Sequence, residues 1–318
     1  WYIFHEVGCH LGNVGLKQIS KNCRKASIRE DQAMTKSHLN ALQKLMSVAT
    51  IILVAQGCAP RESVPVALDE AKASVEATLR VFKPTGSGPF PTVIYLHGAG
   101  DTSWNSTHEP KIKKFTDHGF ATVFVDFYKW RGASGATVNS GGLLPRATAG
   151  DVYVALDWVR RQPWAETGNY GLFGSSFGGA TIMDTLVLDA EDKMPTSISS
   201  KPAGGLDGVK AAAMLAPWCA KDVMGFNLIK AVHEDFATHV PMLAIVPEKD
   251  TISDVSICLN ILHRNKAKGM EIETILVNGA GHTFASPNDE YGQPFSDYDP
   301  VEAKKAWGSV LAHFKKHL

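Results

Sequence analysis

The sequence has few cysteines and no excess of charge of either sign. Its 318 residues include five cysteines, with no Cys-x-x-Cys pair and no zinc-type spacing to histidine. Lysine plus arginine and aspartate plus glutamate each number 32, so the formal net charge is zero. No basic run marks a nucleic-acid surface. We therefore expect no metal, no organic cofactor and no nucleic-acid partner. We also expect Cys219 and Cys258 to be buried free thiols, although the sequence leaves a disulfide between them open.

Long hydrophobic runs are also missing. The apolar segment 46–55 is too short to anchor a helix across a bilayer, but it suits the core of a secretory signal. Lys36 and Lys44 precede it, and Ala55-Gln56-Gly57-Cys58 follows it. This arrangement resembles a bacterial lipoprotein signal, except that such motifs usually carry leucine where Ala55 stands. It predicts export and lipidation of Cys58, with an ordinary secretory signal or a cytoplasmic N-terminal helix as the alternatives.

These features divide the chain into four parts. Residues 1–33 lack clear periodicity, and we interpret them as an upstream extension before a start at Met34. The predicted signal covers 34–57, a tether covers 58–73, and the folded domain covers 74–318. We expect the protein in the periplasm or on the outer membrane, attached through lipidated Cys58, or otherwise secreted.

Strand-like and helix-like segments alternate through the folded domain. Segments with strand periodicity or continuous apolar character lie at 75–83, 91–96, 120–127, 170–173, 209–215, 241–246 and 271–277. Helical patterns lie at 109–118, 151–161, 177–188, 255–265 and from Pro300 onward, where Asp299 is the expected N-cap. Residues 130–144 read as a long loop and 189–207 as an irregular insertion. This alternation predicts an α/β fold, with a doubly wound, mostly parallel sheet and helices on both faces.

A glycine-flanked serine follows one of the predicted strands. Gly174, Ser176 and Gly178 fit the pattern Gly-x-Ser-x-Gly at a strand-to-helix turn. Such a turn holds the serine in a strained backbone and lifts its hydroxyl clear of the sheet. The amide hydrogen-bond donors of the following helix then lie beside a nucleophile. Ser176 is therefore the candidate nucleophile.

A serine hydroxyl needs a neighbouring base, and the base needs an acid to orient it. His282 follows the last predicted strand, and Asp250 follows the strand before it. Because the carboxyl ends of parallel strands meet at one edge, these side chains are expected to gather near Ser176. Asp254 and Asp222 are the alternatives to Asp250 as the acid.

The backbone around the serine also suggests an oxyanion hole, in which two N–H groups would meet the charge of a tetrahedral intermediate. Phe177 directly follows the nucleophile, and Ala99 lies in the His97-Gly98-Ala99 turn after a predicted strand. We expect His97 to fix that turn. Most other histidines, including His313, are expected at the surface. His108 is expected there too, with a position that faces the cleft as the alternative.

These motifs together resemble the dienelactone hydrolase family of α/β-hydrolases. The resemblance covers about residues 75–318, and the final helix is also similar. It departs at the nucleophile, which is cysteine in dienelactone hydrolases proper and Ser176 here. The motifs that carry it are Leu96-His97-Gly98-Ala99-Gly100, Gly174-Ser175-Ser176-Phe177-Gly178-Gly179, Pro247-Glu248-Lys249-Asp250 and Gly279-Ala280-Gly281-His282-Thr283-Phe284.

The resemblance implies an α/β-hydrolase fold and a serine hydrolase of carboxylic esters that acts on a small-molecule substrate through an acyl-enzyme. A prolyl-oligopeptidase-like peptidase and a non-catalytic surface lipoprotein with the same fold are the competing hypotheses. We expect the walls of the substrate pocket to come from aromatic residues in the loops, namely Trp104, Tyr128 and Trp130, with Trp218 and Phe226 as further candidates.

Overall fold

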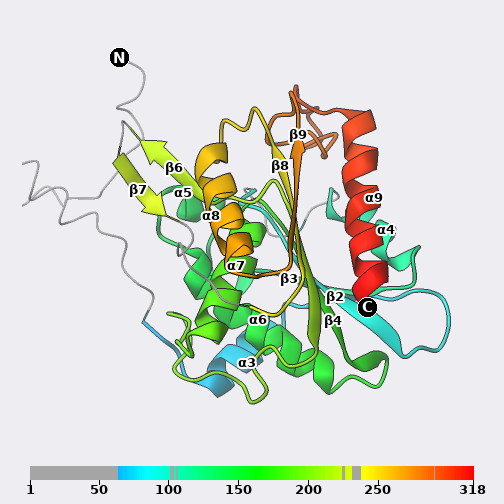
Figure 1. The fold of residues 1–318 in the computed structure, drawn as a ribbon. Coiled ribbons are helices and arrows are strands. Elements are labelled where there is room, and N and C mark those ends of the chain that lie inside the picture. Colours follow the sequence, from blue (N-terminus) through cyan, green and yellow to red (C-terminus); the bar gives the residue numbers. More distant parts are fainter. Residues whose placement is uncertain (1–63, 101–103, 105–106, 224–225, 231–237, 290) are drawn as a thin grey trace, which may run out of the picture. The chain divides into compact units, whose positions relative to one another are not determined.

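The computed structural model describes residues 64–318 except 101–103, 105–106, 224–225, 231–237 and 290 (Figure 1). The predicted signal and Cys58 lie outside these residues. The side chains of Asp222 and Phe226 also lie outside the described part of the structure.

A seven-stranded sheet forms the centre of the domain. Its strands lie in the order β1-β3-β2-β4-β5-β8-β9, and all neighbours pair in parallel except β1 and β3. This confirms the predicted α/β class. The strands are β1 (Arg80–Phe82), β2 (Phe90–Leu96), β3 (Ala121–Val125), β4 (Ala165–Ser175), β5 (Val209–Leu215), β8 (Met242–Pro247) and β9 (Ile272–Val277).

Helices cover both faces of the sheet. In Figure 1, α4 and α9 lie on one side, and α6, α7 and α8 lie on the other. No helix in the described part of the chain combines the length and the apolar composition that a bilayer crossing requires. The helices are α3 (Leu68–Glu76), α4 (His108–Thr116), α5 (Gly135–Asn139), α6 (Pro145–Arg160), α7 (Phe177–Ala190), α8 (Val255–Ala267) and α9 (Pro300–His317).

Two apolar clusters, one on each face of the sheet, make up most of the core. On the side of α9, Trp307 packs on Phe173 of β4 and on Phe115 of α4, with ring centroids 5.2 and 5.9 Å apart. Asp299 caps α9 as predicted, because its Oδ1 accepts the N–H groups of Val301 and Glu302. Burial of these aromatic rings fixes the helices to the sheet and so fixes the strand ends that carry the site.

The N-terminal boundary of the domain differs from the prediction. Residues 68–76 form helix α3, where the sequence suggested the end of a tether and the start of a strand. Ala71 and Val75 are buried four residues apart, so they share the helix face that packs on Val154 of α6. Only Arg80–Phe82 of the predicted strand is β-structure. The prediction failed because a short apolar alternation fits either period.

Three other segments carry more structure than expected. The predicted loop at 130–144 contains part of a short 3₁₀ turn, Lys129–Arg131, and helix α5. Helix α6 begins at Pro145 rather than near Asp151. A two-stranded antiparallel hairpin of β6 (Ala220–Val223) and β7 (Phe226–Lys230) follows β5 and was missed.

The two cysteines of the domain form a disulfide, Cys219–Cys258, with their Cα atoms 5.3 Å apart. The expectation of free thiols is therefore wrong, although both residues are buried as expected. The partners are 39 residues apart in sequence. They meet because Cys219 follows β5 and Cys258 lies in the helix that follows β8, and β5 and β8 are neighbours in the sheet. Spacing along the chain alone does not show such a contact.

Candidate active site

Ser176 lies between the end of β4 and the start of α7. Its backbone has φ 51° and ψ −117°, a positive φ that non-glycine residues rarely adopt. The strain is the one expected of a serine lifted from a strand-to-helix turn. The half-buried serine lies at the carboxyl edge of the sheet, directly after the last residue of β4.

The turn requires small residues on both sides of the serine. A Cβ atom on Gly178 would lie 2.2 Å from the carbonyl oxygen of Leu96 at the end of β2. A Cβ atom on Gly174 would lie 2.4 Å from the backbone of Gly178. Backbone atoms cannot yield as a flexible side chain would, so the glycines let strand β2, strand β4 and helix α7 approach closely.

We predict opposite effects for two helical glycines. Gly178→Ala should lower the free energy of unfolding by about 2 kcal/mol or more, because the new methyl group must displace the backbone at Leu96. Gly308→Ala is the matched control, since Gly308 is an exposed position of helix α9 and nothing lies within 4 Å of a Cβ there. It should raise stability by up to about 1 kcal/mol. Urea unfolding measures both, and equal effects would contradict the close approach at the turn.

His282 links the serine to an aspartate. Its Nε2 lies 2.9 Å from Ser176 Oγ, and its Nδ1 lies 2.6 Å from Asp250 Oδ2. The histidine side chain is 12% exposed and the aspartate side chain 2%, so the carboxylate is shielded from water and the imidazole remains slightly exposed. Asp250 Oδ1 accepts the N–H groups of Ile252 and Ser253, which fixes the carboxylate. The three residues predicted from the sequence therefore lie in one hydrogen-bonded chain.

The alternative acid Asp254 has a different place. It caps helix α8, where its Oδ1 accepts the N–H of Ile257 and the hydroxyl of Ser256. The hydrogen bond from Ser256 lowers the pKa of Asp254, with the bond from Ile257 as the next cause. Asp254 is thus engaged with its own helix, whereas Asp250 contacts His282.

Asp297 supports the histidine loop and was missed in the sequence. Its carboxylate accepts the N–H of Thr283 at 2.9 Å and also the hydroxyl of Thr283. A Cβ atom on Gly281 would lie 2.4 Å from Asp297 Oδ2, so Gly281 allows this contact. Burial raises the pKa of Asp297, but the hydrogen bonds from Thr283 outweigh it and the net pKa is lowered. No local motif marks Asp297, because its contact depends on how the loop folds back.

The predicted oxyanion donors lie where two loops meet. Phe177 is the first residue of α7, so its N–H has no acceptor within the helix. Ala99 lies three residues beyond β2, and a Cβ on neighbouring Gly98 would sit 3.3 Å from Ser176 Cβ. The two segments that carry these amides therefore approach each other at the serine.

His97 fixes the turn that carries Ala99. Its Nε2 accepts the N–H of Phe127 at 3.1 Å, which leaves Nδ1 to donate to the carbonyl of Gly98 at 2.7 Å. Burial lowers the pKa of His97 and keeps the ring neutral. The contacts match the turn-fixing role predicted for His97.

His108 and His313 are buried, which corrects the expectation that they are exposed. His108 lies at the start of α4, with its Nδ1 3.4 Å from Tyr95 Oη and its ring against Phe124. Burial is the largest cause that lowers the pKa of His108 to about 2, followed by electrostatic interactions with His97 and Lys111. The polarity of histidine favours a surface position, and the sequence does not show that aromatic rings surround His108 in the fold.

This buried histidine should make the fold less stable in acid. Unfolded histidine has a pKa near 6.5, so below that pH the unfolded chain binds a proton that folded His108 does not. The unfolding free energy should therefore decrease as the pH falls below about 6.5, by roughly 1.4 kcal/mol per pH unit from this group. His108→Phe should make the difference between pH 7.5 and 5.5 smaller by about that amount in urea unfolding. An unchanged difference would contradict the assignment.

The three aromatic residues predicted to line the pocket are engaged with other parts of the fold. Trp104 stacks on Phe82 with ring centroids 5.4 Å apart. Tyr128 is 1% exposed and meets His97 edge-on. Trp130 donates to Asp151 at 3.4 Å. Their role in substrate binding remains a prediction.

A buried ion pair near these residues was not predicted. Arg131 donates to both carboxylate oxygens of Asp151, at 2.5 and 2.8 Å, and its guanidinium lies 4.0 Å from the centre of the Trp130 ring. Burial raises the pKa of Asp151, and the charge of Arg131 opposes that shift. This pair joins the loop after β3 to helix α6, which carries Asp151.

Metal binding finds no support in the part of the chain that the structure describes. There, no three His, Cys, Asp or Glu side chains gather as metal ligands would.

Two comparisons with known sequences match part of the chain. A family model described as X-Pro dipeptidyl-peptidase (S15 family) matches residues 74–201, a range that includes Ser176 but neither Asp250 nor His282. The uncharacterized 31.7 kDa protein in the traX-finO intergenic region of Escherichia coli is 28% identical over 119 residues, which are 37% of this chain and 40% of that protein. The uncharacterized protein YfhR of Escherichia coli K12 is 31% identical over 33% of this chain and 36% of its own length. The chain thus matches well under half the length of these relatives.

Solved structures match far more of the chain. A protein named "Putative Dienelactone Hydrolase" from Klebsiella pneumoniae gives a TM-score of 0.57 at 16% identity, over 75% of this chain and 92% of its own. A thermophilic esterase from Thermogutta terrifontis with bound propionate gives 0.57 at 15% identity, over 75% and 88%. Likeness at this identity establishes the fold, and the chain has the α/β-hydrolase fold, as the sequence resemblance implied.

Proposed function

We propose that this protein is a serine hydrolase that cleaves carboxylic esters of small molecules through an acyl-enzyme on Ser176. The observation that carries the proposal is the hydrogen-bonded chain Ser176–His282–Asp250 at a strained strand-to-helix turn. Each contact has the length and order that nucleophilic catalysis requires, with the base between the nucleophile and the acid. The esterase and dienelactone hydrolase among the similar structures support the same reaction class.

In the proposed first half-reaction, Ser176 Oγ attacks the ester carbonyl while His282 Nε2 takes the hydroxyl proton. Asp250 holds the Nδ1–H of the ring and stabilises the imidazolium that forms. The amides of Phe177 and Ala99 would donate to the developing oxyanion. Collapse of the intermediate breaks the carbon–oxygen bond to the alcohol, which leaves with the proton from His282.

In the second half-reaction, water replaces the alcohol. His282 takes a proton from the water as its oxygen attacks the acyl carbon. The second intermediate then releases the carboxylic acid and returns the proton to Ser176. No metal or organic cofactor enters these steps.

Cleavage of Xaa-Pro peptides is the second candidate, since the S15 family model matches residues 74–201. The purified protein would be tested with p-nitrophenyl acetate, butyrate and octanoate, and in parallel with an Xaa-Pro p-nitroanilide. We expect turnover of the esters and little of the anilide. Preference for the anilide in kcat/KM would favour the peptidase instead.

Labelling with a fluorophosphonate probe distinguishes both enzyme hypotheses from the hypothesis of a non-catalytic binding protein. We expect one label per chain, on Ser176, because the probe reacts with an activated serine. No labelling and no turnover by the folded protein would overturn the proposal in favour of the binding protein.

We also propose that the protein is exported and attached to a membrane through lipidated Cys58. The Cys219–Cys258 disulfide supports export, since disulfides persist mainly in oxidising compartments. Mass spectrometry of the N-terminal peptide of the mature protein would test it. A diacylglyceryl group on Cys58 is the expected result, and an unmodified Cys58 that is retained within a longer chain would contradict it.

A further inference from the structure

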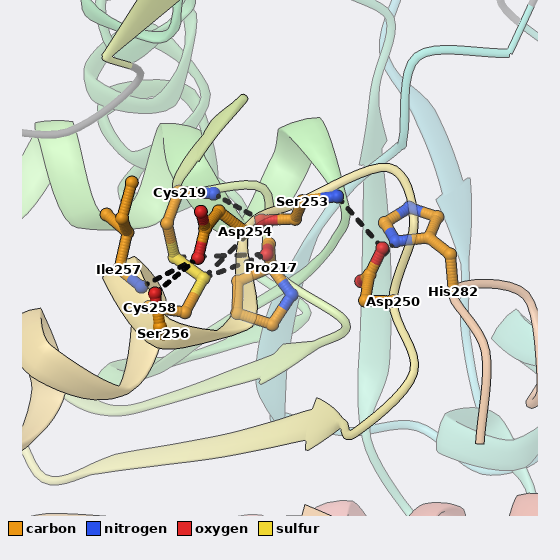
Figure 2. The surroundings of a disulfide bond; sticks show 9 residues. All are labelled: Pro217, Cys219, Asp250, Ser253, Asp254, Ser256, Ile257, Cys258 and His282. Carbon is orange, nitrogen blue, oxygen red and sulfur yellow. Dashed lines mark hydrogen bonds and ion pairs between the residues drawn. A yellow bond between two sulfur atoms is a disulfide. The ribbon is translucent and has the colours of Figure 1, made fainter. Parts of the chain in front are cut away.

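The disulfide lies beside the loop that carries Asp250. Cys219 belongs to the segment between β5 and β6, and Cys258 lies in the first turns of α8. Ser253 sits between them and Asp250 (Figure 2). Its Oγ accepts the N–H of Cys219 at 3.0 Å and lies 3.5 Å from Cys258 Sγ. Both sides of the disulfide therefore contact this one hydroxyl group.

The backbone of the same serine holds the carboxylate. The N–H of Ser253 donates to Asp250 Oδ1 at 2.9 Å, while Asp250 Oδ2 faces His282 Nδ1 (Figure 2). Ser253 is 3% exposed, so water has little access to replace its contacts. A shift of Ser253 would thus change the direction of the carboxylate toward the histidine.

The segment of Cys219 also contacts the nucleophile. The N–H of Trp218 donates to the carbonyl of Ser176 at 3.0 Å. The carbonyl of Ala220 accepts the N–H of Asp254 at 2.9 Å. Residues 218–220 therefore join the serine turn to the Asp250 loop, and the disulfide adds a covalent link between the same two regions.

We propose that Ser253 is a positioning residue for Asp250, and that the Cys219–Cys258 disulfide holds Ser253 in place, so that full activity requires the disulfide. The inference rests on the proposed hydrolase function, because it concerns the orientation of the same Ser176–His282–Asp250 chain. It assigns to the disulfide a role in the geometry of the site beyond the stability that such a link gives.

The disulfide can be opened by a dithiol of the dithiothreitol class. Two electrons and two protons pass from the dithiol to the protein, which gains thiols at Cys219 and Cys258 while the reagent becomes a cyclic disulfide. Both cysteines are 1% exposed, so reduction requires local opening of the loop. Variants therefore test the proposal more cleanly than added reductant.

The test compares Ser253→Ala with Ser256→Ala in the full chain. Ser256 is the matched control, because its exposed hydroxyl contacts Asp254 rather than Asp250. Ser253→Ala keeps the disulfide and should lower kcat for p-nitrophenyl acetate by about tenfold or more with KM nearly unchanged, since small misplacements of a catalytic group slow the chemical step strongly. Ser256→Ala should keep wild-type kcat. Wild-type kcat in Ser253→Ala would overturn the proposal.

The disulfide is tested with Cys219→Ala/Cys258→Ala. We expect the same loss of kcat as in Ser253→Ala, and little further loss when the three substitutions are combined, because both act through Asp250. Independent, multiplying losses would overturn the link between the disulfide and Ser253. If the cysteine variant does not fold, Ser253→Ala alone decides the positioning role.

A readout without substrate separates this inference from the proposed function. The low-field proton of His282 Nδ1–H, bound to Asp250, can be followed by NMR and assigned by its absence in His282→Gln. It should be present in the wild-type protein and in Ser256→Ala, and shifted or broadened in Ser253→Ala. A changed signal in a protein that cleaves no ester would keep the positioning role and overturn the hydrolase. An unchanged signal would overturn the positioning role whatever the activity.

Discussion

Ser176→Ala should lower kcat/KM for p-nitrophenyl esters by at least ~10³-fold. The hydroxyl is the atom that forms the acyl-enzyme, and nothing replaces it in alanine. The residual rate would come from substrate binding and from the amides of Phe177 and Ala99, which the substitution leaves in place. Stopped-flow or steady-state release of p-nitrophenol measures the effect, and labelling by a fluorophosphonate should disappear with it.

Ser175→Ala is the matched control for this prediction. Ser175 is the last residue of β4 and is half-buried like its neighbour, but the hydrogen bond to His282 Nε2 comes from Ser176. We expect Ser175→Ala to stay within about threefold of wild type in kcat/KM. The change replaces a hydroxymethyl group with a methyl group and leaves Ser176, His282 and Asp250 unchanged. Loss of activity in Ser175→Ala together with a fully active Ser176→Ala would contradict the assignment of the nucleophile.

The neighbourhood of Ser176, Asp250 and His282 could be predicted because residues that follow neighbouring parallel strands lie close together at one edge of the sheet. Register pairs Leu96 of β2 with Gly174 of β4, and Ser175 with Leu215 of β5. Ser176, Asp250 and His282 each follow a buried apolar strand in the sequence. Once the strands are recognised, their carboxyl ends must meet at one edge. The sequence pattern therefore predicts both the fold class and the proximity of the serine, the aspartate and the histidine.

The features that were missed depend on contacts between distant parts of the chain. The Cys219–Cys258 disulfide, the bond from Asp297 to Thr283 and the Arg131–Asp151 pair are all formed by loops or helices whose paths no local pattern fixes. Asp297 illustrates the limit. It is one of several acidic residues in an irregular loop, and only its contacts in the fold, with Thr283 and Gly281, distinguish it.

Short elements were the other source of error. Helix α3 was read as a tether and strand because a nine-residue segment offers too few turns for its period to be distinguished. Helix α9 was predicted with the correct N-cap, and its 18 residues repeat the helical pattern over several turns.

Asp250→Asn should lower kcat by about 10⁴-fold, the loss that the same change produces in serine proteases with this type of triad. Asparagine keeps the size of the side chain, but its amide cannot stabilise the imidazolium and favours the wrong tautomer of His282. The carboxylate now accepts His282 Nδ1–H at 2.6 Å through an oxygen that is nearly inaccessible to water. Steady-state kinetics with p-nitrophenyl acetate measures the loss, and circular dichroism checks that the variant is folded.

Asp254→Asn, the same substitution four residues later in the sequence, is the matched control. Asp254 caps α8, and asparagine is about as good an N-cap as aspartate, so Asp254→Asn should change neither stability nor kcat by much. The pair of variants separates two carboxylates that the sequence alone left as alternatives. If Asp254→Asn were the inactive variant and Asp250→Asn retained its kcat, the contact to His282 in the structure would not be the one used in catalysis. A large loss confined to Asp250→Asn would instead tie the rate to the contact between Asp250 and His282.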